Sequence, residues 1–205
     1  MLGKLTISTV GVLALQGDVR EHLAALGRCG AEAVPVRLAA EIEAVDALVI
    51  PGGESTTMGK LLRRFDLEDT LRRRLAGGLP TLTTCAGLIL LSRVIVDGRA
   101  DQLATGTLDI AVRRNAWGSQ LDSFEADLTL DQLGDIPFRG VFIRAPRIED
   151  VGAGVEVLSR LGEEPVAVRQ GRHIGLTFHP EMTGDDRIHR LFLEQASAIR
   201  GESAA

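Results

Sequence analysis

Short apolar runs alternate with segments of helical character through the first half of the chain, and this alternation constrains the fold more than any other feature. The runs predicted as strands are Thr9–Leu15, Ala33–Val36, Asp46–Pro51 and Leu79–Thr84, and the segments predicted as helices are Val19–Cys29, Thr56–Arg64, Leu67–Leu75 and Cys85–Ser92. Strands separated by helices form βαβ units, whose right-handed crossovers make the strands parallel. The sequence therefore predicts an α/β fold with a mostly parallel central sheet flanked by helices.

The second half of the chain is richer in strands. Six further runs are predicted as strands, namely Leu108–Val112, Ser123–Leu130, Gly140–Ala145, Val155–Ser159, Pro165–Arg169 and His173–Phe178. Apolar residues at helical spacing predict a closing helix over Asp185–Ile199. Because no linker or repeat divides the chain, we expect one domain over residues 1–205, with 1–8 and 201–205 at its periphery.

Composition disfavours several classes of function. The formal net charge is −5, from 23 basic and 28 acidic residues, whereas nucleic-acid binding needs a concentrated basic face. No apolar run reaches the roughly 18 residues of a membrane span, and Met1–Val10 lacks the apolar core of a secretory signal. The only two cysteines are too few for a disulfide scaffold, which favours the reducing cytoplasm. We therefore expect a cytoplasmic protein that binds neither nucleic acid nor membranes.

One of the two cysteines, Cys85, lies where a predicted strand gives way to a predicted helix. Such a strand-to-helix elbow exposes a side chain at the carboxyl edge of a parallel sheet, and small neighbours such as Ala86 and Gly87 permit the sharp turn. The start of the helix also favours a thiolate. The elbow alone supports two interpretations of Cys85 equally, a nucleophile and a buried apolar residue. Cys29 is expected to be structural.

A proton partner for a thiolate is found in the string Phe178-His179-Pro180-Glu181. Pro180 favours extended chain at His179, so the side chains of His179 and Glu181 point to one side. One imidazole nitrogen can then bond Glu181 while the other faces Cys85, as in a catalytic triad. Taken with the elbow, this pattern favours catalysis over a solvated turn.

The remaining histidines carry weaker signals. His189 lies among charged residues of the last helix and is expected to be exposed, and His173 is expected at the surface. His22 is expected to be structural or to line the cleft. Since no HxH, HExxH or CxxC pair occurs, no metal site is predicted.

A glycine-rich loop, residues 51–57 with the sequence Pro-Gly-Gly-Glu-Ser-Thr-Thr, follows another predicted strand. Its glycines allow the backbone to approach a ligand and aim N–H groups at it, as in an oxyanion hole. A phosphate-binding loop is rejected, because five residues separate Gly53 from Gly59 and Leu61 follows Lys60 where a hydroxyl is needed. The simpler alternative is a strand-to-helix turn capped by Ser55 or Thr56.

Seven strings together resemble a known family. They are Leu13–Asp18, Pro51–Thr57, Thr84–Ile89, Arg114-Asn115, Asp122–Glu125, Phe142–Pro146 and Phe178–Glu181. They are similar to those of the glutaminase subunits of pyridoxal 5′-phosphate synthase, a branch of the triad (class I) glutamine amidotransferases. The resemblance runs from about Val12 to Leu193 and implies a three-layer, flavodoxin-like α/β fold with extra strands in the second half.

The resemblance implies an enzyme that hydrolyses L-glutamine to L-glutamate and ammonia without a cofactor or metal. Cys85 would be the nucleophile, His179 the general base and then acid, and Glu181 the residue that orients His179. Backbone N–H groups of Gly53 and Ala86 would form the oxyanion hole. The substrate contacts implied are Gly53, Glu54, Ser55, Arg114, Ile143 and Arg144. An arginine can pair the α-carboxylate of an amino acid bidentately, and Glu54 could lie near its ammonium.

The resemblance also implies a partner. The ammonia would pass to a (β/α)₈ barrel synthase subunit that builds pyridoxal 5′-phosphate, and the whole complex would have lyase activity. The loop Gln16, Gly17 and Asp18 is implicated in coupling the two subunits, and the first helix, with Arg20 and Glu21, is a candidate docking surface.

Three positions depart from the family pattern: Thr83 in place of a usual Gly, Trp117 in place of Phe or Tyr, and Ser119 in place of Arg. The first crowds the elbow, and the others affect packing around the cleft. Four alternatives stay open: a glutaminase serving another ammonia acceptor, a cysteine-dependent hydrolase, a stress protein of a related elbow fold and a non-catalytic regulatory homologue.

Overall fold

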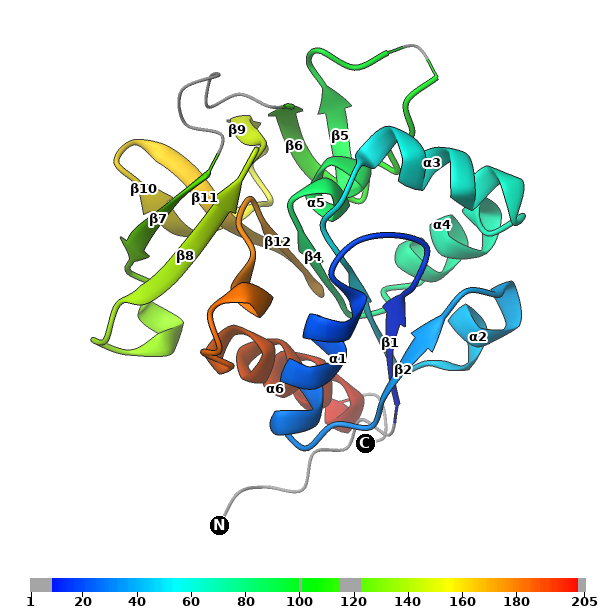
Figure 1. The fold of residues 1–205 in the computed structure, drawn as a ribbon, viewed down its shortest axis with the longest axis horizontal. Coiled ribbons are helices and arrows are strands. Elements are labelled where there is room, and N and C mark those ends of the chain that lie inside the picture. Colours follow the sequence, from blue (N-terminus) through cyan, green and yellow to red (C-terminus); the bar gives the residue numbers. More distant parts are fainter. Residues whose placement is uncertain (1–8, 100, 115–122, 203–205) are drawn as a thin grey trace.

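A computed structural model of the chain describes residues 9–99, 101–114 and 123–202. The first half comprises β1 (Val10–Leu13), α1 (Val19–Arg28), β2 (Ala33–Val36), α2 (Ala39–Ala44), β3 (Ala47–Ile50), α3 (Ser55–Arg64), α4 (Glu68–Ala76), β4 (Thr81–Thr84), α5 (Ala86–Leu91) and β5 (Ser92–Ile95). The second half comprises β6 (Leu108–Arg113), β7 (Ser123–Leu128), η1 (Asp131–Leu133), β8 (Phe138–Ile143), β9 (Arg147–Val151), β10 (Glu156–Leu161), β11 (Glu164–Gln170), β12 (His173–Leu176), η2 (Pro180–Met182) and α6 (Arg187–Glu202). The elements confirm the predicted α/β class (Figure 1).

The central sheet has seven strands in the order β10-β11-β12-β4-β3-β1-β2. The five strands from β12 to β2 are mutually parallel, and β11 and β10 add antiparallel pairs at one edge. The core strands β1, β3, β4 and β12 are buried along their whole length, as expected for parallel strands covered on both faces. The prediction of a mostly parallel sheet is therefore confirmed.

Helices cover both faces of this sheet and make three layers. Alternate residues of β3 face opposite sides, so Leu48 and Ile50 pack in one apolar cluster and Ala47 and Val49 in the other. Helices α2 to α5 contribute to the first cluster, and α1 and α6, which lie side by side in Figure 1, contribute to the second. The hydrophobic free energy of folding therefore comes from two separate apolar layers.

Two smaller sheets, in the order β5-β6-β9 and β7-β8, accompany the central one. The sequence patterns predict no helix or strand for the segments that form α2, β5 and β9. Helix α2 is only six residues long with one buried side chain, Ile42, and β9 (RIEDV) alternates weakly because it is largely charged. Short or charged elements lack the apolar periodicity on which sequence reasoning depends.

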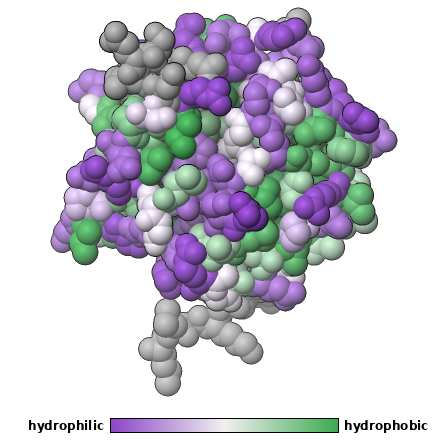
Figure 2. Space-filling model, in the orientation of Figure 1, coloured by the Kyte–Doolittle hydropathy of each residue, from purple (hydrophilic) through white to green (hydrophobic). Residues whose placement is uncertain are grey.

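On the face shown in Figure 2, hydrophilic side chains predominate and apolar ones form smaller patches between them. Within the described residues, no helix is long and apolar enough to cross a membrane.

Candidate active site

Cys85 stands alone between β4 and α5 in a backbone conformation that L residues rarely adopt, with φ 48° and ψ −104°. Its N–H donates to the Leu176 carbonyl at 2.9 Å, which ties the elbow to β12. A Cβ on Gly87 would overlap the Ile50 carbonyl oxygen, so the turn requires a glycine there. Strain of this kind persists where the surrounding structure enforces it, commonly at functional sites.

The strand β12 delivers His179 and Glu181 to the same edge of the sheet. The backbone N–H of His179 donates to the Val141 carbonyl at 2.8 Å, and its Nδ1 lies 2.7 Å from Oε1 of Glu181. Both side chains are buried. The predicted convergence of these two side chains is present in the structure, although η2, a short 3₁₀ turn, rather than extended chain follows His179.

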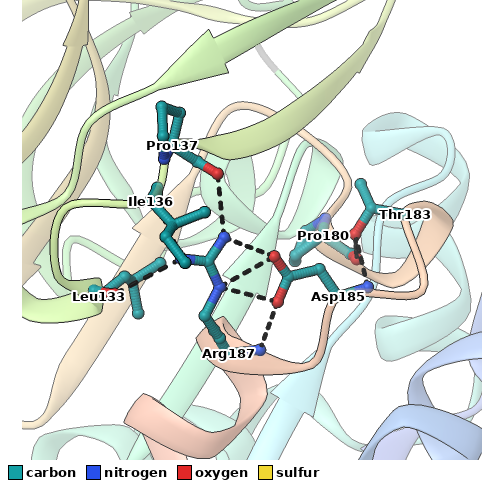
Figure 3. A network of polar contacts seen from close by, with 7 residues as sticks. All are labelled: Leu133, Ile136, Pro137, Pro180, Thr183, Asp185 and Arg187. Atoms are coloured by element: carbon teal, nitrogen blue, oxygen red, sulfur yellow. Dashed lines mark hydrogen bonds and ion pairs between the residues drawn. The ribbon is translucent and has the colours of Figure 1, made fainter.

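The turn that carries Glu181 is anchored from the other side by Arg187, the first residue of α6 (Figure 3). Its guanidinium donates to the carbonyls of Ile136 and Pro137 and pairs with Asp185. Asp185 in turn receives the Arg187 N–H at 3.0 Å and donates its own N–H to Thr183. This network holds the loop after η2 against the segment before β8.

Gly52 borders both the nucleophile candidate and the imidazole. A Cβ at Gly52 would overlap Cε1 of His179 and lie 3.3 Å from the Cβ of Cys85. Burial, the largest influence, favours neutral imidazole, but hydrogen bonds with Asp18, Cys85 and Glu181 outweigh it and raise the pKa of His179. The site therefore favours a protonated His179 next to the sulfur.

Asp18, His179 and Glu181 place one ligand atom each within 4.8 Å of one another, which is compatible in spacing with a metal ion. However, Nδ1 of His179 lies 2.7 Å from Oε1 of Glu181, and because the pKa of that carboxyl is lowered, a hydrogen bond between the two requires the proton on Nδ1. A protonated nitrogen has no lone pair for a metal. The cluster is better described as a buried ion pair with a second carboxylate, Asp18, at 3.5 Å.

The loop after β1 and the glycine-rich loop after β3 touch through their backbones. A Cβ on Gly17 would overlap the Gly52 carbonyl oxygen. With its amide oriented so that oxygen faces the donor and nitrogen the acceptor, Gln16 accepts from the Glu54 N–H at 2.8 Å and donates to the Glu54 carbonyl at 3.2 Å. Gly53 has φ 138°, a conformation suited to glycine. The two loops are thus in direct contact next to the cavity.

These loops enclose a cavity of about 330 Å³. It is lined by Gln16, Asp18, Gly53, Glu54, Ser55, Cys85, Ala86, Ile89, Arg114, Ile143, Arg144 and His179. All the residues predicted to contact substrate lie on this lining, as do both predicted oxyanion-hole residues. Glu181 lies behind His179, and Gly17 supports the loop from outside.

Glu54 caps α3, where its carboxylate accepts from the N–H groups of Thr56 and Thr57 at 2.9 and 2.7 Å. The alternative cap by Ser55 or Thr56 is not formed, because the Glu54 side chain at the N-cap position accepts these N–H groups. Although burial opposes its charge, the bonds from Thr57 and Thr56 lower the pKa of Glu54 to about 2. A fixed negative charge therefore stands at one wall of the cavity.

Arg114 reaches the cavity from the end of β6. Its Nη1 lies 3.3 Å from Oγ1 of Thr56, and its Nε lies 3.9 Å from Asp97. Within the described part of the chain, that buried Nε has no hydrogen-bond partner. Arg114 thus lines the cavity with a positive charge that Asp97 partly balances.

Two expectations about the other histidines are wrong. His189 is fully buried although charged residues surround it in sequence, and His173 is only 8% exposed. The spacing of four residues from His189 to Leu193, itself buried, is the signal that places both on the inner face of α6. His22 is buried too, and it touches both Glu181 and His189.

Thr83 fits the elbow without crowding. It pairs with Gly175 across β4 and β12, and its Oγ1 donates to the Ile174 carbonyl at 3.3 Å. Asn115, Trp117, Ser119 and Asp122 lie outside the described residues.

Comparison with known proteins places these features in context. Residues 12–198 match the SNO glutamine amidotransferase family. The chain is 57% identical to a pyridoxal 5′-phosphate synthase subunit PdxT of Parafrankia sp. (strain EAN1pec) over 185 residues, 90% of this chain and 91% of the relative. It is 58% identical to a PdxT of Mycobacterium sp. (strain KMS) over 193 residues, 93% of each. A crystal structure of a glutamine amidotransferase, 53% identical, superposes with a TM-score of 0.85 over 91% of this chain and 98% of that one.

Proposed function

The chain belongs to the SNO glutamine amidotransferase family, and from this premise we propose that it is the glutaminase subunit of a pyridoxal 5′-phosphate synthase. The observation that carries the proposal is the shared edge of the sheet at which Cys85, His179 and Glu181 meet beside one cavity. In this function the chain hydrolyses L-glutamine to L-glutamate and ammonia and passes the ammonia to a synthase subunit.

The proposed reaction begins with attack of the Cys85 sulfur on the side-chain amide carbon of glutamine. The carbonyl oxygen gains negative charge and is stabilised by the backbone N–H groups of Gly53 and Ala86. His179 gives its proton to the amide nitrogen, the C–N bond breaks, and ammonia leaves a thioester on Cys85. Neutral His179 then takes a proton from water, whose oxygen attacks the thioester and releases glutamate.

Glu181 has the role of orienting and stabilising the imidazolium. Its Oε1 holds Nδ1–H of His179 at 2.7 Å, which leaves the opposite nitrogen of the ring for the sulfur and the leaving group. The raised pKa of His179 supports a resting state in which the proton destined for ammonia is already in place.

Recognition of glutamine follows from the charges at the cavity wall. Arg114 takes the α-carboxylate and Glu54 faces the α-ammonium, while Ser55, Ile143 and Arg144 complete the lining. About 330 Å³ is near the lower limit of small-molecule sites and suits a free amino acid.

The proposed partner is a (β/α)₈ synthase subunit, in a cytoplasmic complex in which residues 1–205 are one glutaminase domain. Support comes from relatives that are themselves named synthase subunits. Arg20, whose side chain is 92% exposed, and Glu21 offer a docking surface on α1 next to the Gln16–Asp18 loop. The backbone contact between Gly17 and Gly52 gives docking a direct route to the oxyanion loop.

The test is release of ammonia from glutamine by the chain with and without the synthase subunit. We expect hydrolysis that rises on addition of the synthase and is absent in Cys85→Ala. A rate of hydrolysis that is the same with and without the synthase would favour a different ammonia acceptor. Absence of hydrolysis under both conditions, with correct folding, would favour a non-catalytic homologue.

A further inference from the structure

Behind the proposed triad, two more buried histidines continue the line of contacts. Nε2 of His22 lies 3.3 Å from Oε2 of Glu181, the oxygen that His179 does not use. Nδ1 of His22 lies 3.0 Å from Nε2 of His189, and the two rings are tilted by 58° at a centroid separation of 5.2 Å. The residues come from α1, η2 and α6, so the tertiary structure alone brings them together.

One arrangement of protons serves the contact between His22 and Glu181 and leaves no ring N–H of His22 or His189 unpaired. If Nε2 of His22 carries a proton, it faces the carboxylate of Glu181, and Nδ1 of His22 can accept from Nε2–H of His189. The remaining nitrogen, Nδ1 of His189, then carries a lone pair instead of a proton. This atom has no hydrogen-bond partner within the described residues. The opposite tautomers would set a lone pair of His22 against a carboxylate oxygen and bury an unpaired N–H of His189, which costs about 1–3 kcal/mol.

The surroundings of this chain of side chains contain few other charges. Thr84 Oγ1, from β4, lies 3.5 Å from Nε2 of His22. Asp186, just before α6, and Arg28, at the end of α1, form an ion pair near His189. Asp18 faces His179 rather than His22. Oε2 of Glu181 makes no hydrogen bond within the described part of the chain, and the ion-pair contact with His22 at 3.3 Å is the one such contact given to it there.

We propose that His22, held by His189, is a positioning residue that keeps Glu181 ionised and turned toward His179. The inference rests on the proposed function and deepens it, since Glu181 orients the proton donor of that reaction. A buried carboxylate with one oxygen unpaired is costly, and it escapes that cost by rotating or by taking up a proton. Either event would remove the negative charge that the imidazolium needs.

The charge balance at Glu181 agrees with this role. Burial favours the protonated acid, but the nearby His22, which is the largest opposing influence, and His179 lower the pKa of Glu181. Without His22, the pKa of Glu181 rises, and the fraction of enzyme with a charged Glu181 falls on the acid side of neutrality.

The experiment compares His22→Gln with His22→Asn in the complete complex with the synthase subunit. The Gln amide nitrogen reaches the place of Nε2 and keeps a donor for Glu181, whereas the shorter Asn reaches only the place of Nδ1. His173→Gln, at the opposite end of β12 from His179, controls for loss of a buried histidine. Circular dichroism establishes that each variant folds.

For His22→Asn we expect kcat to fall roughly 10-fold or more, the scale of losing an outer partner of a functional side chain, with KM for glutamine unchanged. The acid limb of its kcat/KM profile moves to higher pH. His22→Gln restores most of kcat and the position of the acid limb. Equal kcat losses in both variants with an unmoved acid limb would mean that His22 only packs, and unchanged kinetics in His22→Asn would likewise overturn the proposal.

A second readout separates this inference from the proposed function. If the wild-type complex releases no ammonia, the function fails, but the ¹H–¹⁵N resonance of the His179 Nδ1–H bonded to Glu181 still reports the carboxylate. We expect its acid titration to move to higher pH in His22→Asn and to stay in place in His22→Gln and His173→Gln. A resonance that titrates identically in all of them would overturn the role of His22 whatever the enzyme's substrate.

Discussion

The α-carbon of Gly17 lies so close to the carbonyl oxygen of Gly52 that no side chain fits between them. Gly17 belongs to the loop that follows β1, and Gly52 to the loop that follows β3 and borders Cys85 and His179. The loops also contact each other through Gln16 and the backbone of Glu54, so they pack together at two points. Events at the surface of α1 can therefore reach the oxyanion loop without rearrangement of the sheet.

This contact predicts that Gly17→Ala lowers glutamine hydrolysis in the complex, because the new Cβ pushes the Gly52–Gly53 backbone out of place. Gly171→Ala is the matched control, since Gly171 also has a positive φ but has open space around it. Both variants should lose about 1 kcal/mol or more of stability from the φ strain, and Gly17→Ala should lose more than Gly171→Ala because its Cβ also overlaps the Gly52 carbonyl oxygen. Steady-state kinetics and urea unfolding check the prediction. Equal activities in the two variants would contradict the coupling of the loops.

The strained backbone at Cys85 predicts a conflict between stability and catalysis. Cys85→Gly and Cys85→Ala both remove the sulfur, and both should abolish hydrolysis. Glycine tolerates φ 48° without strain whereas alanine does not, so Cys85→Gly should be more stable than Cys85→Ala by about 1–2 kcal/mol. Thermal unfolding measures the difference. A Gly variant that is less stable than the Ala variant would show that the elbow is not strained.

Glu181→Gln keeps the shape of the side chain and removes its charge. The amide oxygen can still accept from His179, but the imidazolium loses its partner, and the pKa of His179 falls. Because the charge acts on the transferred proton, kcat should fall by roughly 10²-fold or more while KM for glutamine changes little. Kinetics over a range of glutamine concentrations measure both. A change confined to KM would reassign Glu181 to substrate binding.

The local parts of this site were predictable from sequence because each depends on a few neighbouring residues. The elbow at Cys85 and the geometry of His179 with Glu181 follow from strand ends, glycines and Pro180. The partnership of His22 with His189 was not predictable, because it needs α1 and α6 to pack side by side. His189 was misplaced for the same reason: its charged neighbours in sequence face away from the side of α6 that packs on the sheet.

The same contrast holds for the fold. Parallel strands such as β3 have a continuous apolar run, which signals a buried strand directly. The strand β9 is held by pairing with β6 rather than by its own apolar residues, and α2 is too short to show periodicity. Elements whose stability comes from neighbours leave little trace in their own sequence.

We predict that replacing Arg114 weakens glutamine binding more than it slows turnover. Arg114→Ala should raise KM for glutamine roughly 10- to 100-fold, the size of a hydrogen-bonded charge interaction, with a smaller effect on kcat. Arg113→Ala is the control, because the adjacent side chain pairs with Glu149 on β9 instead of entering the cavity. Similar KM values for the two variants would indicate that Arg114 does not hold the α-carboxylate.

Because His173 is buried, we predict that the free energy of unfolding falls as the pH is lowered from 7 to 4. Burial, with a smaller contribution from Arg172, lowers the pKa of His173 to about 4 from 6.5. In the unfolded chain the imidazole takes up a proton near pH 6.5, whereas the folded protein resists protonation, so lowering the pH from 7 to 4 favours unfolding. One such histidine lowers the free energy of unfolding by about 3 kcal/mol over that interval.

Two groups of the proposed triad affect stability differently. Glu181, whose folded pKa is lowered, loses its contribution to stability only as the pH falls below about 4.5. His179, whose folded pKa is raised, keeps its full contribution below about 6.5. The free energy of unfolding of wild type and His173→Leu, measured by urea titration between pH 7 and 4, isolates the effect of His173. The wild type should lose more stability than the variant over this range, and parallel curves would show that His173 does not resist protonation in the folded protein.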